Sequence, residues 1–170
     1  MVIIDTIPFM MNSLIPLLAI FGAKYLFLAS IAIAGIYFLK VDKHIQKKII
    51  LCATITLPLI LLVGMIANHI YQNPRPFVVD HFIPLIPHDP DNGFPSDHTL
   101  LVAAIAAIGT IFHRRLGALL WSIAILVAVS RVYVGVHHPI DVIGSIVIAI
   151  LVTCLVYVVG KKKFPLFWKK

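Results

Sequence analysis

Residues 49–71 read IILCATITLPLILLVGMIANHIY, and this stretch decides the fold class. It contains no Asp, Glu, Lys or Arg. A helix of roughly 20 apolar residues crosses the hydrocarbon core of a bilayer, whereas strands of soluble sheets are much shorter. Inside a membrane the backbone must satisfy its own hydrogen bonds, which favours a helix. The stretch therefore predicts a membrane-spanning helix.

Four more apolar stretches lie near residues 19–39, 96–112, 116–134 and 139–160. The chain is 61% hydrophobic and 12% charged, whereas soluble domains are about 45–50% apolar and about 25% charged. We therefore expect an all-α, polytopic integral membrane helix bundle, formed by residues 1–170 as a single membrane-embedded domain. Five spans are preferred, and a sixth within residues 1–20 remains open.

The N-terminal segment, residues 1–20, contains Pro8 and Pro16 and is followed by Gly22 and Ala23. These residues break the apolar pattern, so we expect a short interfacial or re-entrant helix there. No Lys or Arg precedes the first apolar run, which disfavours a cleavable signal peptide.

The net charge of +7 and the pI of about 9.6 do not indicate a nucleic-acid partner in so apolar a chain. Cys52 and Cys154 both lie in apolar runs without metal-ligand spacing, so neither a disulfide framework nor a zinc site is expected. We predict no cofactor, no metal and no obligate protein partner. The expected partners are membrane lipids and a lipid substrate.

The basic residues set the orientation. In the five-span order, 11 of the 14 Lys and Arg residues fall on one side of the membrane: Lys40, Lys43, Lys47, Lys48, Arg114, Arg115, Lys161, Lys162, Lys163, Lys169 and Lys170. The positive-inside rule makes this side cytoplasmic, including the basic tail 161–170. The loops 72–97 and 134–138 then face the extracytoplasmic side.

The outer side gathers histidines, aspartates and two arginines. Five of these lie in mid-loop, where solvation of the loop is their expected role: Asp80, His81, His88, Asp89 and Asp91. Five others lie at predicted helix ends: Arg75, His98, Arg131, His137 and Asp141. Ionisable side chains at membrane spans are costly and indicate function.

Three short segments contain most of these residues: Asn73-Pro-Arg-Pro-Phe77, Phe94-Pro-Ser-Asp-His98, and S-R-x5-H-x3-D from Ser130 to Asp141. In order and spacing they resemble the signatures K-x6-R-P, P-S-G-H and S-R-x5-H-x3-D of the phosphatidic acid phosphatase type 2 superfamily. The resemblance covers roughly residues 20–160. It departs at Asn68, where the family has Lys, and at Asp97, where it has Gly. The second motif with Asp97 in place of Gly, together with Leu85-Ile-Pro-His88 upstream, looks like the bacterial undecaprenyl-diphosphate phosphatase branch.

The residue types fit phosphate chemistry independently. Arg75 and Arg131 are planar, permanently charged donors suited to phosphate. Ser96 is placed to begin a helix, where backbone N–H groups bind anions. Simpler alternatives are a snorkelling Arg131 and a helix cap at Ser96.

Pro139 suits the first position of a helix, so His137 precedes that helix and Asp141 can reach back to it. The resemblance implies that His137 is the nucleophile and that His98 acts as acid and base. It selects His137 over the adjacent His138. We also include Asp97 among the substrate-binding candidates. Asp141 is expected to fix the imidazole tautomer, with helix capping alone as the simpler alternative.

Lys24 lies at the outer end of the first span, against the inward bias of the other basic residues. A lysine there either snorkels to the headgroups or replaces the charge missing at Asn68. We include Lys24 among the substrate-binding candidates.

The resemblance implies a lipid phosphatase of the bacterial plasma membrane whose site faces outward, with undecaprenyl diphosphate as the leading substrate. Phosphatidylglycerol phosphate, phosphatidic acid and lipid A phosphates are alternatives. A small transporter would have polar groups near mid-span and internal repeats, and a metal-dependent hydrolase would have paired ligands on a helix. The sequence shows neither pattern.

Overall fold

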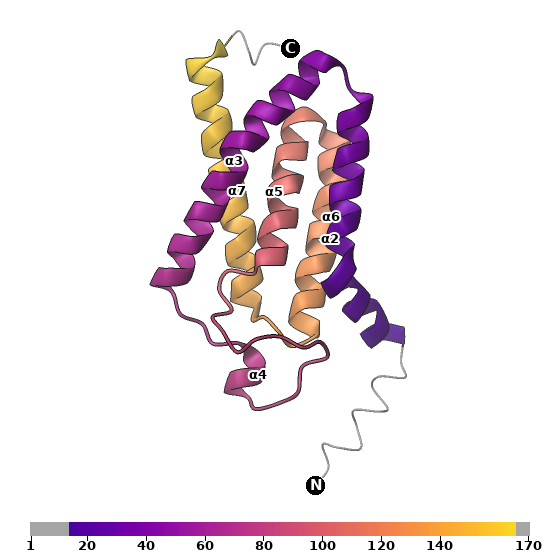
Figure 1. The fold of residues 1–170 in the computed structure, drawn as a ribbon, viewed down its shortest axis with the longest axis vertical. Coiled ribbons are helices and arrows are strands. Elements are labelled where there is room, and N and C mark those ends of the chain that lie inside the picture. Colours follow the sequence, from indigo (N-terminus) through magenta and orange to yellow (C-terminus); the bar gives the residue numbers. More distant parts are fainter. Residues whose placement is uncertain (1–13, 166–170) are drawn as a thin grey trace.

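The computed structural model describes residues 14–165. These residues form five long helices and one short one, and no β-strand (Figure 1). The helices are α2 (Leu14–Lys40), α3 (Lys43–Ile70), α4 (Pro76–Val79), α5 (Asp97–Phe112), α6 (Arg114–Tyr133) and α7 (Pro139–Lys163). The all-α bundle expected from the sequence is confirmed.

Four helices, α2, α3, α6 and α7, are long and apolar enough to cross a membrane. The other long helix, α5, has 16 residues, or about 24 Å at 1.5 Å per residue. Large apolar side chains are exposed along the outer faces of the bundle, among them Leu62, Leu126 and Leu151. Such faces suit lipid, and the bundle of about five helices agrees with the expected spans.

The N-terminal segment agrees only in part with its prediction. Residues 1–13 lie outside the described residues, and residues 14–20 are part of α2, not of a separate helix. The expected break at Gly22 and Ala23 is absent, because both residues are buried within α2. A side chain at Gly22 would collide with Ser130 of α6, so this glycine serves close helix packing. The N-terminal end of α2 bends away from the rest of the bundle (Figure 1).

Helix α5 lies at the centre of the bundle and packs against both α6 and α7. Its buried face is rich in small residues, including Ala103, Ala104, Ala106 and Ala107. Helices in lipid gain little from hydrophobic burial against each other, so close van der Waals contact must hold them. Alanines allow that close approach.

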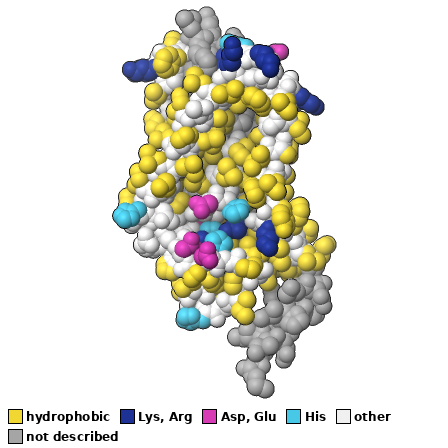
Figure 2. All heavy atoms as spheres, in the orientation of Figure 1, with side chains coloured by type: hydrophobic (Ala, Val, Ile, Leu, Met, Phe, Trp, Pro, Cys, Tyr) yellow, Lys and Arg dark blue, Asp and Glu magenta, His cyan; other side chains and the backbone are white. Residues whose placement is uncertain are grey.

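The two ends of the bundle differ in charge. Lys and Arg side chains gather at the end where α2 joins α3, whereas His and Asp side chains cluster at the opposite end (Figure 2). At this second end lie the loop between α3 and α5, which contains α4, and the short loop between α6 and α7. The fold therefore brings the three sequence motifs to one end.

Candidate active site

His137 is the centre of this cluster. It lies between α6 and α7 with only 2% of its surface exposed. Its Nδ1 atom is 3.0 Å from the backbone oxygen of Gly93 and 3.4 Å from Oδ2 of Asp141. A carbonyl oxygen can only accept a hydrogen bond, so we assign the ring proton to Nδ1. This tautomer leaves the lone pair on Nε2, the nitrogen available to act as a nucleophile.

Two arginines converge on that nitrogen. Nη1 of Arg75 and Nη2 of Arg131 each lie 3.2 Å from Nε2 of His137. Guanidinium groups only donate hydrogen bonds, which agrees with a lone pair on Nε2. Both arginines are buried, and Nε of Arg131 has no hydrogen-bond partner among the described residues. Two clustered cations with an unused donor make a site for an anion.

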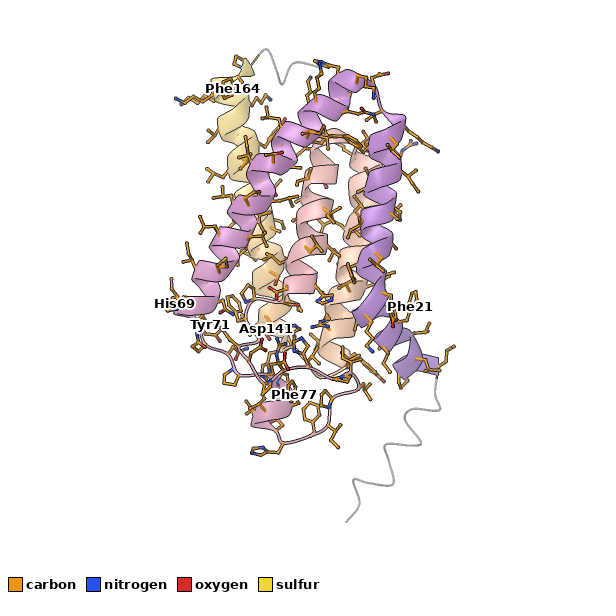
Figure 3. All side chains as sticks on the ribbon, in the orientation of Figure 1. Phe21, His69, Tyr71, Phe77, Asp141 and Phe164 are labelled. Atoms are coloured by element: carbon orange, nitrogen blue, oxygen red, sulfur yellow. The ribbon has the colours of Figure 1, made fainter. Side chains whose placement is uncertain are left out.

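Asp141 holds the imidazole from the other side and lies at the start of α7 (Figure 3). Pro139 occupies the first turn, and Oδ2 of Asp141 accepts a 2.8 Å hydrogen bond from the backbone N–H of His138. Its other oxygen accepts a 2.7 Å hydrogen bond from Nδ2 of Asn73. Asp141 therefore contacts both the backbone at the start of α7 and the His137 ring, and its role in orienting His137 stays a prediction.

Gly93 is needed where the loop between α3 and α5 passes over this carboxylate. A Cβ atom at Gly93 would lie 2.9 Å from Oδ2 of Asp141 and 3.1 Å from the backbone oxygen of Asn73. The absence of a side chain lets the Gly93 carbonyl approach Nδ1 of His137.

Two loop residues expected only to solvate the loop lie against the site instead. Asp91 accepts a 2.6 Å hydrogen bond from Nε of Arg75. The ring centroid of His88 lies 6.1 Å from that of His137. Neither residue belongs to the three signature motifs, so the path of the loop reveals their position.

The electrostatics favour a neutral His137. Burial lowers its pKa below the ordinary 6.5, and the charges of Arg131 and Arg75 lower it further, while the hydrogen bond to Asp141 opposes them. Burial and the same arginines also lower the pKa of His88. Burial alone would raise the pKa of Asp91, but its pairing with Arg75 outweighs burial and lowers it.

The second motif lies at the start of α5. Ser96 is the N-cap residue, as expected, but its hydroxyl makes no capping hydrogen bond and accepts one from Thr99 at 3.1 Å. The backbone N–H of Ser96 donates to the backbone oxygen of Asp141 at 3.3 Å. The second bond fastens the start of α5 to α7 and leaves this N–H committed to Asp141.

His98 and Asp97 follow in the first turn of α5. The His98 ring is half-buried and packs edge-on against Phe27 of α2, with 5.3 Å between ring centroids. His98 interacts electrostatically with both Arg131 and His137. Asp97 is exposed and interacts electrostatically with Arg131. Its role in substrate binding stays a prediction.

Asn68, at the position of the family's lysine, has a structural role. Its Nδ2 atom donates a 2.7 Å hydrogen bond to the backbone oxygen of Phe94, and its own backbone oxygen accepts one from Asn92. These bonds attach the end of α3 to the loop that contains Gly93.

Lys24 lies on the exposed face of α2, one residue after Ala23. Ala23 packs with Val134 and Val136, close to His137 in the chain. The structure thus places Lys24 beside the end of the bundle that contains the site, and its contact with substrate stays a prediction.

An apolar crevice of about 470 Å³ opens next to the candidate nucleophile. Its lining includes Phe82, Ile83 and Leu85 from the loop, Tyr133 from α6, and His137. Gly135 has a φ of +81°, and a Cβ atom there would lie 2.6 Å from the Phe82 ring. A glycine is therefore required both for the turn and for the position of Phe82.

Within the described residues, no group of three His, Cys, Asp or Glu side chains is arranged to hold a metal ion. The positive charge at the site comes from Arg75 and Arg131. Metal-independent activity stays a prediction.

The fold and the site define a multi-pass membrane protein with a buried histidine held between two arginines. The chain belongs to the PAP2 superfamily, whose family model matches residues 47–165. It is 38% identical to undecaprenyl-diphosphatase BcrC of Bacillus subtilis (strain 168) over 112 residues, which cover 66% of this chain and 58% of BcrC. It is 33% identical to YbjG of Escherichia coli (strain K12) over 152 residues, which cover 89% of this chain and 73% of YbjG.

Among solved structures, LpxE of Aquifex aeolicus has the same fold, with a TM-score of 0.64 and 21% identity. The match covers 82% of this chain and 81% of LpxE. The expected membership of the PAP2 superfamily is confirmed, together with the similarity to undecaprenyl-diphosphatases.

Proposed function

We propose that this protein is a membrane lipid phosphatase that converts undecaprenyl diphosphate and water into undecaprenyl phosphate and inorganic phosphate. The observation that supports this most directly is the position of the His137 Nε2 lone pair between the guanidinium groups of Arg75 and Arg131. Phosphoryl transfer requires charge stabilisation around the equatorial oxygens and an in-line nucleophile. This arrangement offers both.

In the first step, Nε2 of His137 attacks the terminal phosphorus and forms a P–N bond. The bond between that phosphorus and the bridging oxygen breaks, and His98 donates a proton to the leaving lipid phosphate. The Nδ1–H group keeps its hydrogen bonds to Gly93 and Asp141, so Asp141 stabilises the positive charge that develops on the ring.

In the second step, His98 takes a proton from water, and the water oxygen attacks the phosphohistidine. The P–N bond breaks, inorganic phosphate leaves, and the neutral imidazole is restored. Arg75 and Arg131 neutralise the phosphoryl oxygens in both steps. Ser96 and Asp97 complete the proposed site at the start of α5, and Lys24 supplies a further cation at its rim.

A lipid substrate is supported by the crevice beside His137, because Phe82, Ile83 and Tyr133 line an apolar path from the nucleophile. The relative BcrC is named an undecaprenyl-diphosphatase, which supports a polyprenyl diphosphate as that lipid. The basic residues at the opposite end support an extracytoplasmic site in a bacterial plasma membrane.

The test is phosphate release by the purified protein from undecaprenyl diphosphate, phosphatidylglycerol phosphate, phosphatidic acid and a lipid A phosphate, each with and without excess EDTA. We expect the highest kcat/KM for undecaprenyl diphosphate and no loss in EDTA. A higher kcat/KM for another of these lipids would show that undecaprenyl diphosphate is not the preferred substrate. Activity restored only by a divalent cation would overturn the metal-independent mechanism.

A further inference from the structure

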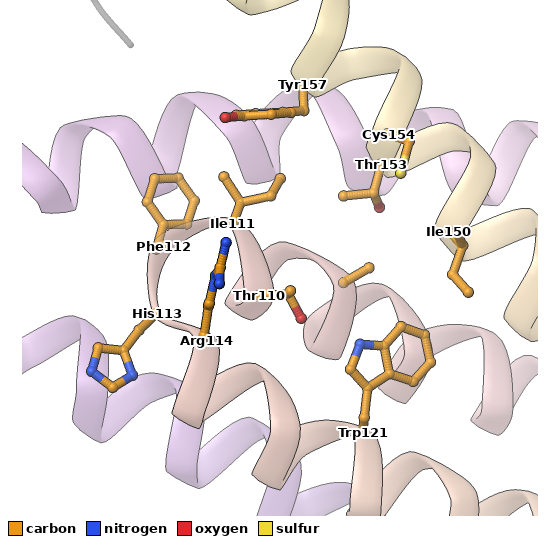
Figure 4. A pocket seen from close by; sticks show the side chains of 11 residues that line it. Thr110, Ile111, Phe112, His113, Arg114, Trp121, Ile150, Thr153, Cys154 and Tyr157 are labelled. Atoms are coloured by element: carbon orange, nitrogen blue, oxygen red, sulfur yellow. The ribbon is translucent and has the colours of Figure 1, made fainter. Parts of the chain in front are cut away.

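A second cavity lies at the basic end of the bundle, opposite the candidate active site. It has a volume of about 770 Å³ and lies among α5, α6 and α7 (Figure 4). The apolar part of its lining includes Ile111, Trp121 and Ile150. Cavities of this size are typical of sites for small organic ligands.

The cavity has a structural cause. Helix α5 is about 24 Å long from its 16 residues, shorter than the hydrocarbon core of about 30 Å. It turns directly into α6 at His113, so this hairpin ends below the tops of α2, α3 and α7 (Figure 1). The space above the hairpin forms the cavity.

One positive charge lines this space, and a second lies near one of its lining residues. Arg114 lines the cavity at the start of α6, and its side chain makes no hydrogen bond or ion pair with the described residues. Nζ of Lys161 lies 5.9 Å from the ring centroid of Tyr157, which also lines the cavity. The Arg114 side chain is exposed at the start of α6, so its guanidinium is available to pair with an anion that enters the cavity.

A buried hydroxyl gives a second, independent sign of a ligand. Thr153 of α7 lines the cavity and is 2% exposed, yet its Oγ1 atom has no hydrogen-bond partner among the described residues. A buried hydroxyl without a partner is costly, so a ligand oxygen at this position would remove the cost. Figure 4 shows Thr153 on α7 and Arg114 on α6 around the same space.

We propose that this cavity binds one anionic phospholipid from the leaflet at the basic end of the bundle. The phosphate pairs with Arg114 and Lys161, and an ester oxygen accepts a hydrogen bond from Thr153. The part of an acyl chain nearest the headgroup packs on Trp121 and Ile150. Basic pockets between membrane helices bind anionic headgroups in this way. The site is independent of the proposed phosphatase activity.

Cys154 provides the reporter, because it lines the cavity and is exposed, whereas the other cysteine, Cys52, is buried. In a Cys52→Ala background in neutral detergent, the rate of Cys154 labelling by N-ethylmaleimide is measured with phosphatidylglycerol, phosphatidylcholine or inorganic phosphate added. We expect phosphatidylglycerol to slow labelling at least fivefold and the other two to leave it unchanged. Equal slowing by both lipids, or slowing by inorganic phosphate, would overturn the proposal.

Arg114→Gln should abolish the protection by phosphatidylglycerol and Thr153→Val should weaken it. Arg115→Gln is the matched control, because Arg115 is adjacent but does not line the cavity. Native mass spectrometry should find one retained phosphatidylglycerol in the wild type and in Arg115→Gln, and none in Arg114→Gln. If Arg114→Gln retains the lipid as Arg115→Gln does, the proposal is wrong. The comparison among additives requires only the Cys52→Ala protein to fold, and Cys52 does not line the cavity.

Discussion

Asn73 donates a 2.7 Å hydrogen bond from its Nδ2 atom to Oδ1 of Asp141, across 68 positions of the chain. The same carboxylate reaches Nδ1 of His137 through its other oxygen. Asn73 therefore connects the first motif to the group that orients the proposed nucleophile, and we infer that it is a positioning residue.

Asn73→Ala should reduce kcat about ten- to a hundredfold with little change in KM. Removing one partner of a buried charged group costs about 1.5–3 kcal/mol, and each 1.36 kcal/mol is tenfold in rate. Steady-state kinetics on undecaprenyl diphosphate provide the measurement. Gln72→Ala is the matched control, because the exposed Gln72 side chain bonds only to backbone oxygens of α3. Equal kcat values for the two variants would contradict the positioning role.

The phosphohistidine is tested directly by trapping. His137→Ala should abolish turnover and any covalent phosphoenzyme, because no other group replaces Nε2. His98→Ala should still phosphorylate His137 slowly when the leaving group is good, and then hydrolyse the intermediate poorly. Radiolabelled substrate, rapid quench at alkaline pH and peptide mapping locate the phosphate. Phosphate found on any residue other than His137 would refute the assignment.

The pH profile follows from the depressed pKa of His137. Protonation of Nε2 removes the lone pair, so activity is lost as the pH falls through the pKa of the folded protein, which lies below 6.5. The acid limb of kcat/KM should therefore lie below pH 6.5. Arg131→Gln removes one of the charges that lower this pKa, so its residual activity should have an acid limb at higher pH. An acid limb at or above pH 6.5 in the wild type would contradict the burial argument.

Lys24→Met should lower kcat/KM about ten- to a hundredfold, because it removes a charge-assisted hydrogen bond of about 1.5–3 kcal/mol to the substrate phosphates. The variant keeps the apolar stem and the position on α2. Lys40→Met, at the other end of the same helix, is the control and should retain wild-type activity. A kcat/KM for Lys24→Met within about twofold of wild type would show that Lys24 only snorkels.

Topology is tested by cysteine accessibility. In a variant without Cys52 and Cys154, a cysteine at Asp89 should react with an impermeant maleimide added to intact cells, because Asp89 is exposed in the loop before α5. A cysteine at Lys163, at the end of α7, should react only after the membrane is permeabilised. The reverse pattern would place the site in the cytoplasm.

The sequence by itself determined the class of fold and predicted the main candidate site residues. Apolar runs such as residues 49–71 predict helices, because a continuous run of this length satisfies its own backbone hydrogen bonds in lipid as a helix. Arg131, His137 and Asp141 lie close together because only a short loop and the first turn of α7 separate them along the chain. Local geometry of this kind can be read from the chain.

The tertiary structure decided what depends on contacts between distant segments. The path of the loop between α3 and α5 brings Asp91 to Arg75 and the Gly93 carbonyl to His137, and no local pattern predicts either contact. In the sequence, Gly22 indicated a break in the helix. In the structure it allows α2 to pack closely on α6, because the absence of a side chain can favour either a helix break or close packing. The cavity beside Arg114 also required the structure, because it arises from the length of α5 relative to its neighbours.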